Sequence, residues 1–412
     1  MKRVYSYVAG LAVLAMAFSA NAGSYQLNDY SVTGLGRSYA GQGIMGDDYS
    51  AIAYNPAGMT LMKRSGVQQA FSLINLKSDI QNLGGNGEKA KMDFWQPIPA
   101  GFAQYNVNDK LSLGLGIYAP YGLKTKYKAD WFGKESAILS KLDIVDFNLS
   151  VAYKLTQHWS IGASAILRYI YGRMTQTVPM VAPGVGGGDI NFNVHGWTQT
   201  GSLGVMYEVD QNTRFGLSYR LRSAQRAKGH FKVSGNHNYI ASLPLMFKNG
   251  IYPVEASPDL PETVTFSAYH RYKDLGFSGT ARWTHWTSSF PSFTVRSPAL
   301  PGGQKETHYR YQNTWTLTGG VDYYYNQNWT FRMGGGWDES PTHKPERRTF
   351  RIPDNDRWWM SVGASYAKNN WQVDAAYARM IGKTGVADEG NLKAKYKNLR
   401  SNILGVQVQY KF

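Results

Sequence analysis

The chain has 412 residues, and 44 Lys and Arg against 28 Asp and Glu give it a formal net charge of +16. It contains no cysteine, which excludes a disulfide framework, a thiol nucleophile and a thiolate metal site. Mean hydropathy is negative, and no apolar run reaches the roughly 20 residues of a membrane-spanning helix, so a helical membrane protein is excluded. The basic residues are scattered, which argues against nucleic-acid binding and favours contact with an anionic outer surface or an inward cationic lining.

The first residues have the pattern of an export signal. Lys2 and Arg3 form a positive start, Val8 to Phe18 an apolar run, and Ala20-Asn21-Ala22 a small-x-small cleavage site. The sequence therefore predicts a signal peptide over residues 1–22, with the mature protein starting near Gly23. Loss of Lys2 and Arg3 lowers the formal charge from +16 to +14.

Residues 23–65 differ from the rest of the mature chain, because they lack both the period-two alternation of a strand and a helical stripe. A wide β-barrel needs something to close its lumen, and this segment is predicted to be that hatch, or plug. The alternative is a disordered periplasmic tail, against which stand many apolar anchors. These anchors are Tyr25, Leu27, Tyr30, Leu35, Tyr39, Ile44, Met45 and Ile52.

Two motifs stand out in the predicted hatch. Asn55-Pro56-Ala57 favours a turn, because proline fixes its own backbone and biases its neighbour away from helix. Asn-Pro alone is most often an ordinary turn, but its position at the end of the hatch, just before the first strand, favours a functional role. Asp47 and Asp48 are expected to bond backbone amides of the hatch rather than to perform acid-base chemistry.

Residues 66–412 alternate apolar and polar side chains, as in the final run from Leu404 to Phe412. Such alternation fits a soluble sandwich as well as a membrane barrel. The connections decide between them: six short turns rich in Asn, Asp and Gln alternate with seven long loops, the first of which is expected over residues 79–91. Thirteen connections predict an all-β fold, a 14-stranded antiparallel transmembrane β-barrel over residues 66–412. Phe412 is a suitable terminal aromatic for recognition by the barrel-assembly machinery.

Prolines mark one region of the predicted wall. The second strand contains Pro97 and Pro99, and the third contains Pro120-Tyr121-Gly122. A hairpin centred on residues 106–109 would place Pro97 opposite Tyr118. Proline cannot donate to the ladder, so the strands either end here at the outer rim or kink to open a side window (a lateral gate). The residues alone leave both interpretations open.

Sites for chemistry are scarce. None of the eight histidines has the spacing of a metal site, and the Gly-rich run at residues 184–188 lacks the Lys-Ser/Thr of a phosphate loop. The sequence therefore predicts no enzyme, no cofactor and no metal. An outer-membrane barrel enzyme such as a lipase remains as the alternative from a different class.

Several segments together resemble the FadL-type family of outer-membrane transporters for long-chain fatty acids and aromatic hydrocarbons. They are SYQLNDYSVTGLGRSYAGQG with the DD and NPA that follow it, LPETVTFSAYHRY, YYYNQNWTFRMGGGWDESP and IPDNDRWWMSVGASY. The resemblance spans nearly the whole mature chain. It implies a hatch, external loops that capture a hydrophobic ligand, and a kinked third strand where the ligand leaves sideways through the wall.

The resemblance also implies ligand-binding residues. The capture loop corresponds to residues 119–140, with Leu123, Trp131, Phe132, Ile138 and Leu139 as apolar contacts. The positions where the fatty-acid transporters place lumen cations correspond to the neutral Gln176 and Gln312. Arg173 and Arg310 lie close to them and are candidates to replace those cations.

The combined prediction is passive transport of hydrophobic compounds, most of all long-chain fatty acids, across the outer membrane of a Gram-negative bacterium. A channel for neutral aromatic or aliphatic hydrocarbons is the alternative. The predicted partners are the ligand, outer-membrane lipid and lipopolysaccharide, and the barrel-assembly machinery. No nucleic acid is expected, and the protein is predicted to be a monomer.

Overall fold

The computed structural model describes residues 25–85, 87–236, 238–241, 243–257, 259–289 and 292–412. The predicted signal peptide, residues 1–22, lies outside the described residues. Within these ranges no helix is both long and apolar enough to cross a membrane.

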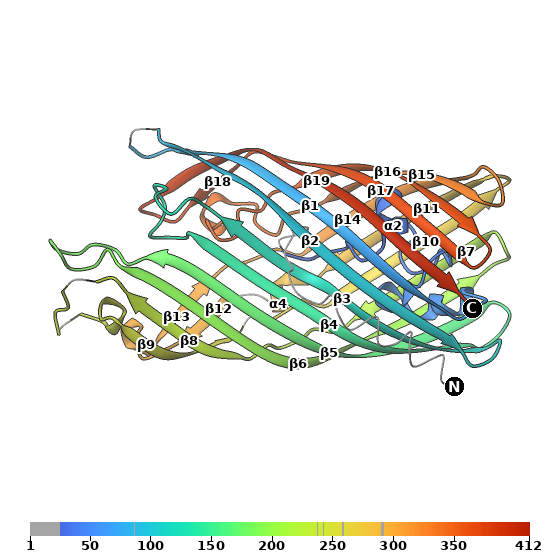
Figure 1. Ribbon diagram of the computed structural model, residues 1–412, viewed down its shortest axis with the longest axis horizontal. Helices are drawn as coiled ribbons and strands as arrows, with labels where there is room; N and C mark the ends of the chain where they lie inside the picture. The colour runs from blue at the N-terminus through green and yellow to red at the C-terminus, as the bar shows by residue number, and fades with distance from the viewer. Residues whose placement is uncertain (1–24, 86, 237, 242, 258, 290–291) are drawn as a thin grey trace.

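The described residues form one elongated barrel (Figure 1), a sheet of nineteen strands in which β1 pairs with β19 to close the ring. All pairings between these strands are antiparallel, and the ladder between β1 and β19 extends from Gly66 to Asn82. The strands are β1 (Gly66–Asn82), β2 (Lys89–Asn106), β3 (Leu111–Lys126), β4 (Leu139–Lys154), β5 (Trp159–Thr177), β6 (Asp189–Glu208), β7 (Thr213–Arg220), β8 (Ala227–Ser234), β9 (Gly250–Ser257), β10 (Thr263–Tyr272), β11 (Leu275–Thr284), β12 (Ser292–Arg296), β13 (Gln304–His308), β14 (Thr314–Tyr324), β15 (Trp329–Asp338), β16 (Arg357–Lys368), β17 (Trp371–Gly382), β18 (Gly385–Asp388) and β19 (Lys393–Lys411).

Five barrel strands are interrupted, and each consists of two consecutive segments that share their neighbours in the sheet. These pairs are β7 with β8, β9 with β10, β11 with β12, β13 with β14, and β17 with β18. Nineteen segments less five interruptions leave fourteen barrel strands. The predicted strand number, and the all-β antiparallel fold, are confirmed.

All six predicted short turns join neighbouring strands at one end of the barrel, and the long loops join them at the other end (Figure 1). The strands extend further into the loops than the sequence indicated. The first long loop was expected over residues 79–91, but β1 continues to Asn82 and β2 begins at Lys89. Ladder pairings with both neighbours of β1 keep these residues extended.

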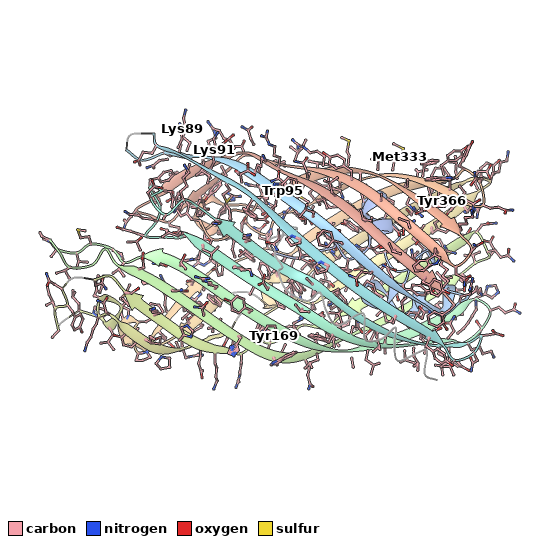
Figure 2. The ribbon with its side chains drawn as sticks, viewed as in Figure 1. Lys89, Lys91, Trp95, Tyr169, Met333 and Tyr366 are labelled. Atoms are coloured by element: carbon pink, nitrogen blue, oxygen red, sulfur yellow. The ribbon has the colours of Figure 1, made fainter. Side chains whose placement is uncertain are left out.

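The apolar face of the strands points outward. Met360 is 76% exposed and Leu149 58% exposed, whereas the polar Gln407 and Asp374 are buried inside. Figure 2 shows Trp95, Met333 and Tyr366 on the outer surface of the wall. An outward apolar band flanked by aromatic residues is typical of a transmembrane barrel and excludes the soluble sandwich.

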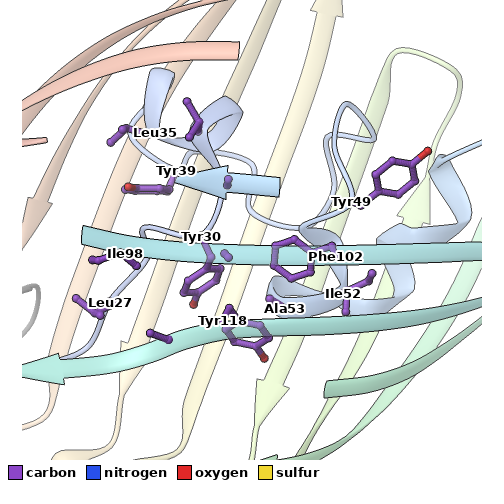
Figure 3. Close-up of a cluster of buried hydrophobic side chains, with 14 of the residues drawn as sticks. Leu27, Tyr30, Leu35, Tyr39, Tyr49, Ile52, Ala53, Ile98, Phe102 and Tyr118 are labelled. Carbon is purple, nitrogen blue, oxygen red and sulfur yellow. The ribbon is translucent and has the colours of Figure 1, made fainter. Parts of the chain in front are cut away.

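The N-terminal segment contains three short helices, α2 (Val32–Gly36), α3 (Ala51–Tyr54) and η2 (Pro56–Leu61). Ser31 begins α2 as its N-cap, because its hydroxyl accepts a hydrogen bond of 2.8 Å from the amide of Gly34. The apolar side chains of the segment are buried against inward-facing residues of the barrel (Figure 3). The other short helices lie in loops and are η3 (Leu245–Phe247), α4 (Trp286–Ser289), η4 (Pro301–Gly303) and η5 (Pro345–Arg347).

Candidate functional site

The Asn55-Pro56-Ala57 turn is packed against the barrel wall. The side-chain oxygen of Asn55 accepts from the amide of Ala57 at 3.1 Å, and its nitrogen donates to the carbonyl of Val205 on β6 at 3.3 Å. Glycines on the wall make this approach possible: a Cβ on Gly204 would lie 2.0 Å from the Asn55 oxygen, and one on Gly162 2.5 Å from the Ala57 amide. Glycine in these strands therefore provides the space that the turn occupies.

The two adjacent aspartates of the segment have different partners. Asp47 forms ion pairs with Arg37 of the same segment and with Arg332 of β15, the latter at 3.3 Å. Arg37 also reaches Asp322 of β14 at 2.6 Å, so that side of the segment is held to the wall by buried charges. Asp48 accepts hydrogen bonds from within the segment, including a backbone amide at 3.0 Å. The expectation of backbone-amide bonds thus describes Asp48 better than Asp47.

The wall is incomplete between β2 and β3. The two strands pair only from the turn up to Gly101 opposite Ile117, and beyond this point no ladder joins them. The sequence prediction that Pro97 lies opposite Tyr118 is wrong, because the observed register, if extended, would bring Pro97 level with Tyr121. The four-residue turn at residues 107–110 shifts the register by three residues from the predicted one.

The prolines explain part of this gap. The ladder between β1 and β2 is uninterrupted and includes Pro97 and Pro99. Residues two apart direct their backbone groups to the same neighbour, so both prolines present their missing donor toward β3. A strand edge with two absent donors cannot continue a regular ladder.

The third strand also departs from regular geometry. Its ladder with β4 shifts between Tyr118 and Tyr121, and its free edge is bonded by the N-terminal segment. The amide of Leu27 donates to the carbonyl of Pro120 at 2.9 Å, and the amide of Gly122 donates to the carbonyl of Tyr25 at 2.8 Å. The N-terminal segment therefore occupies backbone positions on β3 that β2 leaves unpaired.

A largely apolar cavity lies beside this junction, under the long loops. It comprises about 650 Å³ not filled by atoms, part of it open to solvent. Tyr25 of the N-terminal segment and Leu123 of β3 both line it. The other apolar lining residues are Leu142, Ile170, Met174, Phe192, Val194, Ala256, Phe293, Tyr309 and Ile352.

Lys141 and Arg351 are the two cations among the lining residues, and Lys141 pairs with Asp143 at 2.7 Å, whereas Arg351 is fixed by neutral groups of the wall. Its guanidinium donates to Ser140 Oγ of β4 at 3.1 Å and to the side-chain oxygen of Gln176 on β5. No carboxylate lies within ion-pair distance of Arg351 in the described part of the chain. Burial lowers the pKa of this guanidinium, which means that its charge lacks the solvation it has in water. Glu389 opposes this shift from beyond ion-pair distance, and a ligand carboxylate in contact with the guanidinium would oppose it more strongly.

The sequence-predicted ligand residues are dispersed. Leu123 lines the cavity, and Gln176 contributes by holding Arg351. Trp131 is buried in a separate loop cluster, stacked on Tyr127 at 3.9 Å with Phe132 packed beside it. Ile138 and Leu139, at the start of β4, are partly buried and are not among the residues lining the cavity.

The predicted alternative cations also lie elsewhere. Arg173 shares a strand face with Tyr171, as the sequence indicated, but that face points out of the barrel rather than into the lumen. Arg310 and Gln312 are exposed in the loop before β14 and do not line the cavity. Sequence reasoning missed Arg351, although a single basic residue between the apolar Phe350 and Ile352 was an available signal.

Chemistry-bearing clusters are few. In the ranges that the structure describes, no three His, Asp or Glu side chains are arranged to hold a metal ion. His285 and Tyr219 both contact Glu262 on the outer wall, at 2.6 and 2.7 Å.

Known proteins share both the sequence pattern and the fold. A family described as outer membrane protein transport protein (OMPP1/FadL/TodX) matches residues 13–412. The chain is 28% identical to a long-chain fatty acid transport protein of Salmonella typhi, over 98% of this chain and 97% of that protein. It is 25% identical to outer membrane protein P1 of Haemophilus influenzae, over 100% of both chains.

Solved structures agree on the architecture. A Pseudomonas aeruginosa FadL homologue superposes with a TM-score of 0.84 at 22% identity, covering 95% of this chain and 100% of that one. The Pseudomonas putida toluene transporter TodX gives a TM-score of 0.68 at 17% identity, also covering 95% and 100%. The chain therefore belongs to the OMPP1/FadL/TodX family of transport proteins, and it is an outer-membrane β-barrel of the Gram-negative type.

Proposed function

We propose that the protein carries long-chain fatty acids passively across the outer membrane, with the apolar cavity at Arg351 as its binding site. The observation that carries this proposal is a buried cation with no carboxylate within ion-pair distance among the described residues, at the side of a largely apolar cavity. That combination matches an amphipathic ligand with one carboxylate and a long chain. Burial of the chain supplies roughly 0.8 kcal/mol per methylene, which requires no covalent chemistry.

The N-terminal segment acts in this proposal as a hatch. Tyr25 both lines the cavity and bonds the free edge of β3, so a ligand that displaces Tyr25 also weakens the contact at Gly122. Withdrawal of the segment from β3 would leave the unpaired region between β2 and β3 as a lateral gate into the membrane. The ion pairs of Arg37 and Asp47 would meanwhile keep the rest of the hatch attached to β14 and β15.

The test is uptake by cells that lack their own transporter. Cells that express this chain should accumulate labelled oleate, and the barrel should show only small conductance in planar bilayers, because the N-terminal segment fills the lumen. No uptake of oleate in cells with folded barrel contradicts the proposal. Uptake of toluene without oleate would support the alternative, a channel for neutral hydrocarbons, for which the apolar lining of the cavity is equally suitable.

A further inference from the structure

Three basic residues stand at directly opposite positions on neighbouring strands. Lys124 on β3 is the ladder partner of Lys141 on β4, and Lys141 is the partner of Arg173 on β5. Their chain neighbours Leu123 and Leu142 line the inner cavity. Since side chains alternate along a strand, Lys141 and Arg173 point away from the lumen. The Lys124 ammonium lies at the open junction with β2, where it donates to the buried side chain of Gln96. We call Lys124, Lys141 and Arg173 the outer basic row.

The row has an excess of positive charge. Like charges directly opposite one another destabilise a sheet. The carboxylate paired with the row is Asp143, which lies 2.7 Å from the Lys141 ammonium. Lys124 donates to the neutral side chain of Gln96 at 3.1 Å, and the buried Nε of Arg173 has no hydrogen-bond partner among the described residues. Three cations thus share one carboxylate, and an anion is needed to relieve their repulsion.

The height of the row on the barrel indicates where this anion comes from. Tyr169 lies on the outer wall (Figure 2), with Trp197 at 4.9 Å between ring centroids. Such aromatic groups mark the border between hydrocarbon and headgroups. Arg173 is four residues further toward the long loops on the same face, which is roughly 10 Å along the barrel axis for a tilted strand. The row therefore lies at the headgroup level of the outer leaflet.

Below the row, the wall presents an apolar surface to lipid chains. Leu149 is 58% exposed, Trp197 56% and Leu167 44%. A second outward basic pair, Lys77 opposite Arg400, is less suitable, because Asp93 pairs with Lys77 at 2.9 Å and leaves one cation uncompensated. The combination of spare positive charge and apolar wall is strongest on β3 to β5.

We propose that the outer basic row is a binding site for the phosphates of lipid A, the membrane anchor of lipopolysaccharide in the outer leaflet. Arg173 and Lys141 bind a phosphate of the glucosamine headgroup, and Lys124 adds a third positive charge. The acyl chains lie along the exposed wall of β4 to β6. Charge complementarity carries the assignment: a phosphate bears more negative charge than the zwitterionic headgroups with which it competes.

The experiment measures lipid retained by the protein purified from outer membranes in mild detergent. The Lys141→Gln/Arg173→Gln variant should retain at least tenfold less lipopolysaccharide than the original protein, measured by native mass spectrometry. Added lipid A should bind the original protein, and lipid A stripped of both phosphates should bind it as weakly as it binds the variant. The control is Lys368→Gln, which removes an exposed cation at the opposite end of the barrel, on β16.

Folding of each variant is checked by heat-dependent gel mobility. The Lys141→Arg variant keeps the charge and should retain the lipid. Equal retention by the double variant and the control overturns the proposal. Equal affinity for phosphatidylglycerol and lipid A also overturns it, because the site would then accept any anionic lipid. If oleate uptake falls while bound lipid A is unchanged, the row serves the leaving fatty acid instead.

Discussion

Substitution of Arg351 by glutamine should weaken the binding of fatty acids without affecting the binding of neutral ligands. The guanidinium is held at Ser140 and Gln176 and faces an apolar cavity, so its main expected partner is the ligand carboxylate. A hydrogen bond to a charged group contributes about 1.5–3 kcal/mol. The variant should therefore bind oleate about 10- to 150-fold more weakly. Oleyl alcohol, which has the same chain and no carboxylate, should bind the variant and the original protein equally.

The assay is displacement of a fluorescent fatty acid from purified barrel in detergent, with oleate and oleyl alcohol as competitors. Arg347→Gln is the matched control, because it removes the same charge from the same loop at a residue that contacts Arg310 rather than the cavity. Arg351→Lys keeps a point charge without the planar guanidinium, so its affinity for oleate should lie between those of the original protein and of Arg351→Gln.

Two results would refute this reasoning. An equal loss of affinity for oleate and oleyl alcohol would show that Arg351 shapes the cavity rather than binding the carboxylate. No loss for either would place the binding site elsewhere. In both cases the cavity could still serve hydrocarbons, and uptake of toluene by the same variants would show whether it does.

Three further predictions concern the N-terminal segment. Gly162→Val should push the Asn-Pro-Ala turn off the wall, because its Cβ would lie 2.5 Å from backbone, at a cost of about 1–3 kcal/mol. The barrel should still form while the segment becomes sensitive to protease. Gly319→Val is the control: a Cβ there would meet nothing within 4 Å, so barrel formation and protease sensitivity should both stay unchanged. Gln26 and Tyr121 are bridge partners, so a Gln26→Cys/Tyr121→Cys disulfide should stop oleate uptake until it is reduced; undiminished uptake with the bond intact would exclude a moving hatch. Burial raises the pKa of Asp29 from 3.8 to about 6, so this group's contribution to stability is complete below 3.8 and is lost as pH rises through about 6. Asp29→Asn should therefore protect the segment from hydrogen exchange at neutral pH but not below pH 3.8, and equal protection at both would argue against a buried acid.

The strand count was predictable from the sequence, because turn residues and alternation are local signals. The face of a particular residue was harder to assign. Arg173 shares a face with Tyr171, but the sequence does not say which face meets lipid. The closed barrel shows that this face, and the arginine with it, lies outside the lumen. Alternation defines two faces of a strand, while the side that meets water depends on the closed barrel.

The candidate site was predictable only in part. Leu123 belonged to a segment with a recognisable role, but Arg351 reaches the cavity through contacts with strands more than 170 residues earlier in the sequence. The predicted register between β2 and β3 was wrong for a local reason. Composition located the turn, but the hydrogen bonds that define its four residues are known only from the structure. The role of glycines such as Gly162 and Gly204 could not be predicted, because the segment that packs on them is distant in sequence.

The seam of the barrel constrains how the molecule can be assembled. The N-terminal segment continues directly into β1, and β1 is the strand that the last strand, β19, must find to complete the ring. The amide of Phe412 donates to the carbonyl of Ser65, so closure ends at the residue where the segment joins the wall. A folded segment with buried arginines cannot thread through a finished ring. Docking of the segment and closure of the ring therefore share one seam, and a change at Ser65 would affect both.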